Sequence, residues 1–474
     1  MTRRTLAASF AALSLVTTPI AAPAQDFPTK MPALGTPKPF TVPGAETFRL
    51  PNGMQVTLIP YGITPTAVVS LRVFAGELNQ GEDVALPTVT AQMLREGAAG
   101  RSGAQIAEAA ASMGGNLSVA PGQHETAVTL NVLSEHTPDA VRLIADVVRR
   151  PDFPASELER VRQSALRNLA VAKSQAQPLA DVALASAYYG NNHPYGRLVP
   201  TEPQLKGYTL ADIRRFYDAN FGAQRARLYV AGQFDAAAVR AAIEQAYSDW
   251  AAGPDRLKLP PQPQPGPRVV LVDRPGAPQS TVRLAFPAPV AGTPGDLPMR
   301  VSNALLGGGF SSRITKNIRE AKGYTYSPGS STAFNAGEAI WSFNADVTTD
   351  VTGPAVKEVL SEIRRMQNET IPEEEAAGMR NYLAGTFVLQ NASPGGLINS
   401  IATRDFHGLP ANWLDAYVPG VLAVTAPAMQ TSVRQALPLE KMTLVVVGDL
   451  AKVTPQLKAL PELKNVQFQT VQPF

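Results

Sequence analysis

The chain of 474 residues contains no cysteine, so disulfides cannot stabilise it and packed cores must do so. Histidine is scarce as well, and no two of His124, His136, His193 and His407 are four residues apart. Two imidazoles four apart share one helical face and can hold one ion, so their absence excludes the helical two-histidine zinc motifs. We expect His193 to be a loop or core residue with one hydrogen bond, and His124 to lie at a solvated strand end.

Long apolar runs are lacking outside the N-terminus. The first 24 residues carry Arg3, Arg4, an apolar stretch and Ala22-Pro23-Ala24, a combination typical of a secretory signal peptide. We therefore expect residues 1–24 to be removed and the mature protein to be exported to the periplasm. No later run approaches the ~20 apolar residues of a membrane helix, so a soluble chain without a membrane span is expected.

An excess of charge of one sign is also missing. The sequence has 42 basic and 39 acidic residues, and the loss of Arg3 and Arg4 with the signal peptide leaves 42 − 2 = 40 against 39. The mature net charge of about +1 argues against a nucleic acid as the partner.

Proline, in contrast, is abundant in two stretches that divide the chain. Residues 25–45 form a proline-rich leader, and residues 254–268 have the composition of a semi-rigid extended linker. The linker separates an N-terminal domain, 46–253, from a C-terminal domain, 269–474. Without the signal peptide, 474 − 24 = 450 residues remain, which is too long for one typical core.

The two halves have the character of repeats of one design. Three pairs of matching features recur at similar offsets: Leu86-Pro87 and Leu297-Pro298 after 211 residues, Arg149-Arg150 and Arg364-Arg365 after 215, and residues 228–232 and 444–448 after 216. Offsets so close to one another indicate a duplication.

Each half combines strands with helices. Residues 341–347 alternate apolar and polar, as a half-buried strand does, and residues 127–133 are a weaker equivalent in the first half. Helical runs follow these strands at 138–149, 157–173, 353–366 and 372–389. This order predicts an α+β fold with two homologous α/β-sandwich domains.

The segment LGGGFSSRITKNIREAKGYTY, residues 306–326, carries the clearest chemical pattern. Arg319 ends a predicted helix, Gly323 makes a turn and Tyr326 opens a strand, so a cation and a phenol lie seven positions apart and can grip a peptide carbonyl. A purely structural role is the alternative, in which Arg319 neutralises the helix dipole and Tyr326 is a strand aromatic. Gly307, Gly308 and Gly309 form either a flexible substrate-facing loop or a packing turn, and a phosphate loop is disfavoured because no Lys-Ser/Thr follows.

This segment closely resembles the second-domain signature of the pitrilysin/insulinase metallopeptidases, the inverzincins. The resemblance extends from about Phe48 to Gly448. It implies two domains, each a largely antiparallel sheet with helices on one face. It also implies that Arg319 and Tyr326 hold the substrate backbone and stabilise the oxyanion, with Ser312 and the three glycines beside the substrate.

Members of this family bind zinc through HxxEH on a first-domain helix and a glutamate on a second helix. Residues 69–76 resemble the strand before the zinc helix, and residues 93–98 resemble the exit of that helix. This frame places Thr88, Ala91 and Gln92 where His, Glu and His stand in the family.

The third ligand is replaced too. Residues 159–163 resemble the run that precedes it, and the matching position holds Asn168. Hydroxyl and amide oxygens are weak donors for zinc, so we expect no metal and no other cofactor on this chain.

Two functions remain. In the first, the chain is the metal-free subunit of a heteromeric peptidase, in which a homologous HxxEH subunit holds zinc and this chain lends Arg319 and Tyr326 to cut peptides or unfolded polypeptides. In the second, it is an inert peptide-binding or structural homologue, like the metal-free core subunits of respiratory complexes. The presence of both Arg319 and Tyr326 favours the first. An independent zinc peptidase is excluded by residues 88, 91, 92 and 168.

Overall fold

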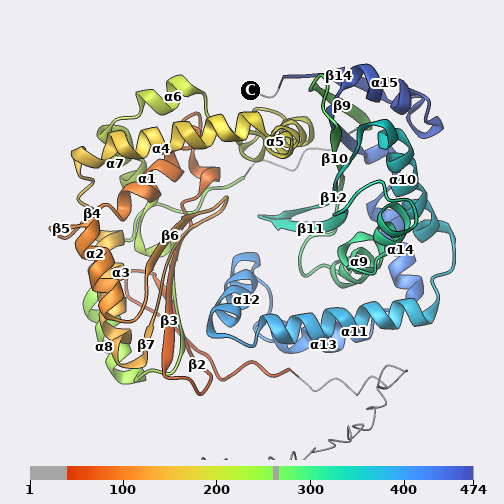
Figure 1. Cartoon of the computed structure of the whole chain (residues 1–474). Helices are drawn as coiled ribbons and strands as arrows, with labels where there is room; N and C mark the ends of the chain where they lie inside the picture. Colours follow the sequence, from red (N-terminus) through yellow and green to blue (C-terminus); the bar gives the residue numbers. More distant parts are fainter. Residues whose placement is uncertain (1–39, 260–265, 473–474) are drawn as a thin grey trace, which may run out of the picture. The chain divides into compact units, whose positions relative to one another are not determined.

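The computed structural model describes residues 40–259 and 266–472, which belong to one compact unit (Figure 1). The predicted signal peptide, most of the predicted leader and the centre of the predicted linker lie outside the described residues. Within them, no helix is both long and apolar enough to cross a membrane.

The first sheet has the strand order β1-β2-β8-β3-β7-β6. Only the β2–β8 pair is parallel, and the predicted hairpin joins β1 to β2 through Pro51, Asn52 and Gly53. Because β8 comes from the end of this half and inserts between β2 and β3, it brings the first and last parts of the half together. The strands are β1 (Glu46–Arg49), β2 (Gln55–Pro60), β3 (Thr66–Val73), β6 (Leu117–Pro121), β7 (Thr126–Leu133) and β8 (Ala226–Gly232).

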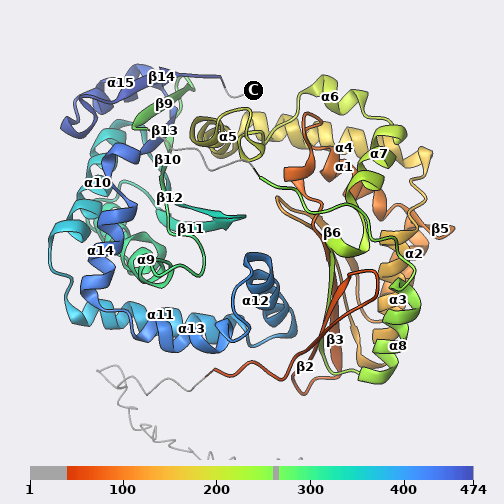
Figure 2. The same ribbon diagram turned by 180° about the vertical axis from the view of Figure 1, so that it is seen from behind.

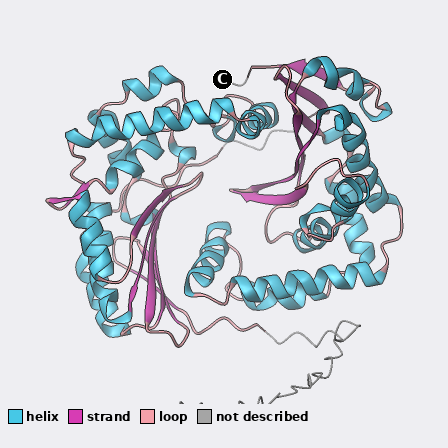
Figure 3. Cartoon of the chain, in the orientation of Figure 1, coloured by secondary structure: helices cyan, strands magenta, loops and turns pink. Residues whose placement is uncertain are grey.

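Helices α3 and α8 cover one face of the first sheet (Figure 1, Figure 3). Alternate strand residues such as Val69, Leu71 and Leu228 point into the core beneath these helices. A small two-stranded sheet, β4 (Gly97–Ala98) with β5 (Arg101–Ser102), lies at the edge. The helices of this half are α1 (Leu86–Leu94), α2 (Gly103–Ser112), α3 (Thr137–Arg149), α4 (Ala155–Ser174), α5 (Ala176–Tyr189), α6 (Glu202–Gly207), α7 (Leu210–Asn220) and α8 (Ala236–Tyr247).

The second sheet repeats the design, with the order β11-β12-β10-β13-β9-β14. Its first five strands match β6, β7, β3, β8 and β2 in position and direction, which confirms the predicted duplication. The sixth strand differs, because β14 runs parallel to β9 whereas β1 runs antiparallel to β2. The strands are β9 (Arg268–Asp273), β10 (Gln279–Pro287), β11 (Gly329–Asn335), β12 (Glu338–Thr348), β13 (Thr443–Gly448) and β14 (Gln467–Thr470).

The helices of the second half pack mainly on one face of this sheet, as the family resemblance implies (Figure 3). Two π-helical segments, η5 (Ala304–Gly308) and η6 (Thr315–Ala321), follow the first of these helices. The helices are α9 (Asp296–Asn303), α10 (Thr352–Asn368), α11 (Glu373–Gln390), α12 (Pro394–His407), α13 (Trp413–Leu422), α14 (Ala426–Ala436) and α15 (Leu450–Lys458).

Two corresponding helices are exchanged between the halves, which the sequence does not predict. Helix α5 packs through Ala180 and Ala183 on Val270 and Val445 of the second sheet, on the face away from α10. Helix α12 contacts β8 and β3 of the first sheet in return (Figure 1, Figure 2). Each sheet is therefore partly covered on its second face by a helix from the other half.

Candidate functional site

The segment 306–326 is built from two unusual helical turns. Helix α9 runs directly into the π-helical turn η5, and after a reversal of the chain the second π-helix, η6, begins at Thr315. Ser312 is fully buried, its hydroxyl donates to Thr315 Oγ1 over 2.9 Å, and it accepts the Thr315 backbone N–H. π-Helices are rare in proteins and are frequent at functional sites. The local geometry therefore favours a functional role for this segment.

The three glycines allow close packing at the reversal. A Cβ on Gly307 would lie 2.6 Å from Ser330 Oγ, and one on Gly309 would lie 2.9 Å from the Ala304 carbonyl oxygen. Gly307 and Gly309 are buried, and Gly308 is exposed. A Cβ on Gly308 would lie 2.5 Å from Asn303 Nδ2, so the packing-turn alternative gives all three glycines a structural role. The contact of Gly307, Gly308, Gly309 and Ser312 with substrate stays a prediction.

Arg319 lies in the last turn of η6 and faces two aromatic rings. Its Cζ is 4.7 Å from the ring centroid of Phe310 and 5.1 Å from that of Tyr326. Phe310 and Tyr326 are 73% and 80% exposed. Among the described residues, neither the Arg319 guanidinium nor the Tyr326 hydroxyl has an ion pair or hydrogen bond, so both polar groups are free to bind a ligand.

The turn between Arg319 and Tyr326 is fixed by the backbone. Gly323 has φ = 64°, in the left-handed region that favours glycine, and its N–H donates to the Arg319 carbonyl oxygen over 3.1 Å. Thr325 Oγ1 donates to the Asp346 carbonyl oxygen over 2.7 Å, and Thr325 forms an isolated bridge with Val347. Tyr326 therefore follows an anchored residue.

One detail of the prediction for Tyr326 is wrong. Strand β11 begins at Gly329, three positions later, so Tyr326 lies in the connection before the strand and does not open it. A side chain in this connection has no neighbouring strand to pack against, which is why the ring is exposed.

The predicted zinc positions lie on helices α1 and α4 but present no ligands. Ala91 is fully buried, Thr88 and Gln92 are half-buried on the same helix, and Asn168 is exposed on α4. The described residues contain no group of three or more His, Cys, Asp or Glu side chains that can hold a metal ion. An alanine, a hydroxyl and two amides do not fit zinc.

Three of the four histidines lie in one aromatic cluster instead. His193 accepts the Tyr195 backbone N–H at Nδ1 over 3.3 Å, as expected for a buried loop histidine. His124 Nε2 lies 2.9 Å from Tyr195 Oη, and its ring packs on Phe406. Burial, together with the nearby charge of His407, lowers the pKa of His124 to about 4. The prediction of a solvated strand end for His124 is therefore wrong, because the second half covers it.

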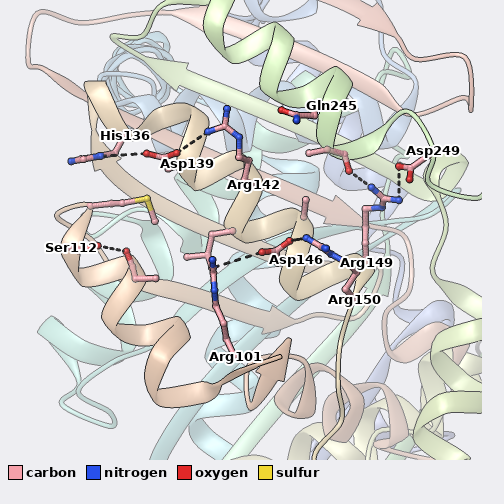
Figure 4. A pocket seen from close by; sticks show the side chains of 15 residues that line it. Arg101, Ser112, His136, Asp139, Arg142, Asp146, Arg149, Arg150, Gln245 and Asp249 are labelled. Atoms are coloured by element: carbon pink, nitrogen blue, oxygen red, sulfur yellow. Dashed lines mark hydrogen bonds and ion pairs between the residues drawn. The ribbon is translucent and has the colours of Figure 1, made fainter. Parts of the chain in front are cut away.

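A second candidate site is a hollow of about 690 Å³ on the helical side of the first half (Figure 4). Its arginines are numerous but paired with aspartates, as the close view shows. The pairs are Arg101 and Arg150 with Asp146, Arg142 with Asp139, and Arg149 with Asp249. With its charges satisfied, this hollow is a weaker candidate than the unpaired Arg319 and the exposed Tyr326.

Comparison with known proteins agrees with the geometry. The family model described as insulinase (peptidase family M16) matches residues 60–201, and the model described as peptidase M16 inactive domain matches residues 207–383. An uncharacterized zinc protease of Mycobacterium tuberculosis is 26% identical over 350 residues, which are 72% of this chain and 78% of that protein.

Two further matches lack an assigned peptidase activity in their descriptions. A non-peptidase homolog of Helicobacter pylori is 19% identical over 80% of this chain and 87% of its own length. A solved structure from Pseudomonas fluorescens, described as a peptidase M16 inactive domain, superimposes with a TM-score of 0.79 and 22% identity, covering 85% of this chain and 98% of that one. The chain belongs to the insulinase family, peptidase family M16, as a member that lacks the zinc ligands.

Proposed function

We propose that this chain is the metal-free subunit of a heteromeric zinc peptidase, exported to the periplasm, and that it lends Arg319 and Tyr326 to a homologous HxxEH subunit. One observation carries the proposal: a half-buried guanidinium lies beside an exposed phenol, and neither has an acidic partner among the described residues. A solvated aromatic ring and an unpaired cation do nothing for the core of this half. They are well suited to a ligand that arrives from outside.

The chemistry assigned to the two residues is binding and charge stabilisation. The Tyr326 hydroxyl donates a hydrogen bond to the oxygen of the scissile carbonyl, which becomes an oxyanion as the partner subunit attacks the carbon. The Arg319 guanidinium contributes a fixed positive charge and further donors for the peptide backbone. No hydrolytic step is assigned to this chain, since its residues do not fit the metal.

An inert peptide-binding role is the second candidate. It is supported by the similarity to a non-peptidase homolog and by the family model named for an inactive domain. In that case Arg319 and Tyr326 bind a peptide backbone without any turnover.

Reconstitution with a homologous HxxEH subunit separates the two. The purified chain, the partner and their mixture are assayed on an unfolded polypeptide. Activity that appears only in the mixture, and that falls sharply with Tyr326→Phe, supports the peptidase subunit. A partner that works equally well alone, or a mixture that ignores the substitution, contradicts it.

A further inference from the structure

Three arginines form a lateral row across the first sheet. Arg49 lies opposite Gln55, Gln55 lies opposite Arg227, and Arg227 lies opposite Arg72, on strands β1, β2, β8 and β3. Residues directly opposite one another point to the same face of a sheet. Arg49, Arg227 and Arg72, here called the arginine row, therefore stand on one face.

That face is the one opposite helices α3 and α8. On β8, Leu228 and Val230 belong to the core beneath those helices, while Tyr229 and Ala231 pack in the cluster that contains α12. Arg227 is two residues before Tyr229 on β8, so its side chain points to the same face of the sheet as that of Tyr229. The arginine row consequently lies beside α12, whose Asn399 accepts a hydrogen bond from Arg72 over 2.5 Å.

The charges of the arginine row are not balanced. Arg72 is paired with Glu125 over 2.8 Å, but the hydrogen bonds of Arg49 go to the neutral Gly53 carbonyl and Gln55 side chain. Arg227 has no carboxylate partner among the described residues, and its Nη1 is buried without a hydrogen bond. A buried donor without an acceptor costs free energy, which an incoming anion recovers.

Two acids lie near these cations, and Glu125, whose charge also acts on Arg256, is already paired with Arg72. Asp405 is already bound by Arg404 over 2.7 Å. It also accepts hydrogen bonds from Gln55 Nε2 and the Tyr229 hydroxyl.

A fourth arginine adds to the excess. Arg256, from the segment after the first half, has its Cζ 3.5 Å from the ring centroid of Phe74, and Arg227 has its Cζ 5.1 Å from the same centroid. Arg256 has no ion pair within the described part of the chain. Desolvation and the neighbouring Arg227 charge lower the pKa of Arg256 to about 10. Two cations that share one ring repel each other, and an anion between them relieves the repulsion.

A cavity of about 220 Å³ opens beside Arg256. Phe74 and Arg256 line it together with Asn79, His124 and Phe406. This volume takes a side chain or a short extended segment and excludes a folded domain.

We propose that Arg49, Arg227 and Arg256 form a binding site for the carboxylates of an acidic polypeptide segment. Arginine recognises carboxylates through a planar, bidentate fork. Arg49 and Arg227 stand two strands apart, about 10 Å, too far for one small anion to bridge at their bases. An extended peptide places alternate side chains about 7 Å apart on one side, so Glu or Asp at positions i and i+2 reach both. The site takes from the proposed function only that the ligand is a polypeptide.

Fluorescence anisotropy on the purified full chain tests the site. The probes are two labelled peptides of equal length, one with alternating Glu and one with Gln at the same positions. We expect the Glu peptide to bind at least tenfold more tightly, with an affinity that falls as salt rises. Equal affinity for the two peptides overturns the proposal.

Substitutions locate the binding. Arg227→Gln and Arg256→Gln should each weaken the Glu peptide by roughly tenfold, the loss expected for one charged hydrogen bond. Arg49→Gln, on an exposed side chain of an edge strand, is the variant least able to disturb folding and should weaken it severalfold. Arg142→Gln, whose partner Asp139 lies in the hollow of Figure 4, is the matched control and should bind as wild type.

Competition with inorganic phosphate tests whether the arginines bind phosphate oxygens in place of peptide carboxylates. Phosphate should displace the Glu peptide no better than sodium chloride of equal ionic strength. Displacement by micromolar phosphate would mean a phosphate site and overturn the proposal. These measurements contain no peptidase partner. A failure to bind the Glu peptide therefore says nothing about the proposed peptidase subunit, and a failure to reconstitute a peptidase says nothing about the peptide site.

Discussion

The Arg319 guanidinium lies 5.1 Å from the centre of the Tyr326 ring, and no hydrogen bond or ion pair in the described structure holds either polar group. The contact is a cation–π interaction at an exposed position, which contributes about 0.5–1 kcal/mol. Such a contact limits where the guanidinium can go but leaves its N–H donors and the phenol hydroxyl unused. The pair is thus preorganised for a ligand.

Removal of the Tyr326 hydroxyl isolates its role. Tyr326→Phe keeps the ring that contacts Arg319, so the chain should assemble with its partner as before. If the hydroxyl binds the oxyanion, kcat of the assembled pair should fall by about 10²–10³, the usual loss for one such donor. Steady-state kinetics on the mixture, with assembly followed by size-exclusion chromatography, give the answer. Wild-type turnover in this variant would assign the tyrosine to structure.

Phe310 should position Arg319 without touching the substrate carbonyl. Phe310→Leu removes the second ring, 4.7 Å from the Arg319 Cζ, and keeps an apolar side chain at an exposed site. A loss of about 0.5–1 kcal/mol corresponds to a two- to fivefold fall in kcat/KM. Phe310→Tyr retains a ring and should restore the wild-type value. An equal fall in kcat/KM for both variants would show that the contact between the aromatic ring and the guanidinium does not position Arg319.

The fold class follows from the sequence because its signals are local and repeated. Alternation at 341–347 becomes β12, and the offset between residues 228–232 and 444–448 becomes the match between β8 and β13. The exchange of α5 and α12 is not predictable in this way. It depends on which helix face has residues small enough to approach the other half's sheet, such as Ala180 and Ala183, and that partner is distant in sequence.

The candidate site likewise has one part that the sequence predicts and another part that it does not. Arg319, Gly323 and their turn are recognisable because they are close in the chain and fixed in spacing. The ring of Phe310 stacks on Arg319 only after the chain reverses at the glycines, so no spacing rule gives the contact. The arginine row is still less visible, since β8 must first insert between β2 and β3 to bring Arg227 beside Arg72.

Metal analysis tests the absence of a zinc site directly. The chain purified alone, dialysed against trace zinc at neutral pH, should retain well under one equivalent, because Thr88, Ala91, Gln92 and Asn168 offer only neutral oxygens or nothing. Elemental analysis by mass spectrometry measures the ratio. The double substitution Thr88→His with Gln92→His provides a positive control, since it restores two imidazoles four apart on α1. One tightly held zinc in the wild-type chain would contradict the prediction.

Acid should weaken the contact of His124 with the second half. The folded state lowers the pKa of His124 from 6.5 to about 4, chiefly by burial, so between these values the unfolded chain binds a proton that the folded chain does not. The free energy of unfolding therefore rises with pH across this window. The contribution of His124 is complete above pH 6.5 and is lost as pH falls toward 4, by up to roughly 3 kcal/mol.

Urea denaturation at pH 7.0 and pH 5.0 measures this loss. Carboxylates titrate in the same range, so the informative quantity is the difference between wild type and His124→Asn, which cannot take up the proton. The variant should be less stable at pH 7.0 but should lose less on acidification. His136→Gln, a change at a partly exposed histidine beside Asp139, should follow the wild-type curve. If wild type and His124→Asn lose the same free energy of unfolding on acidification, then protonation of the imidazole packed against Phe406 and Tyr195 does not cause that loss.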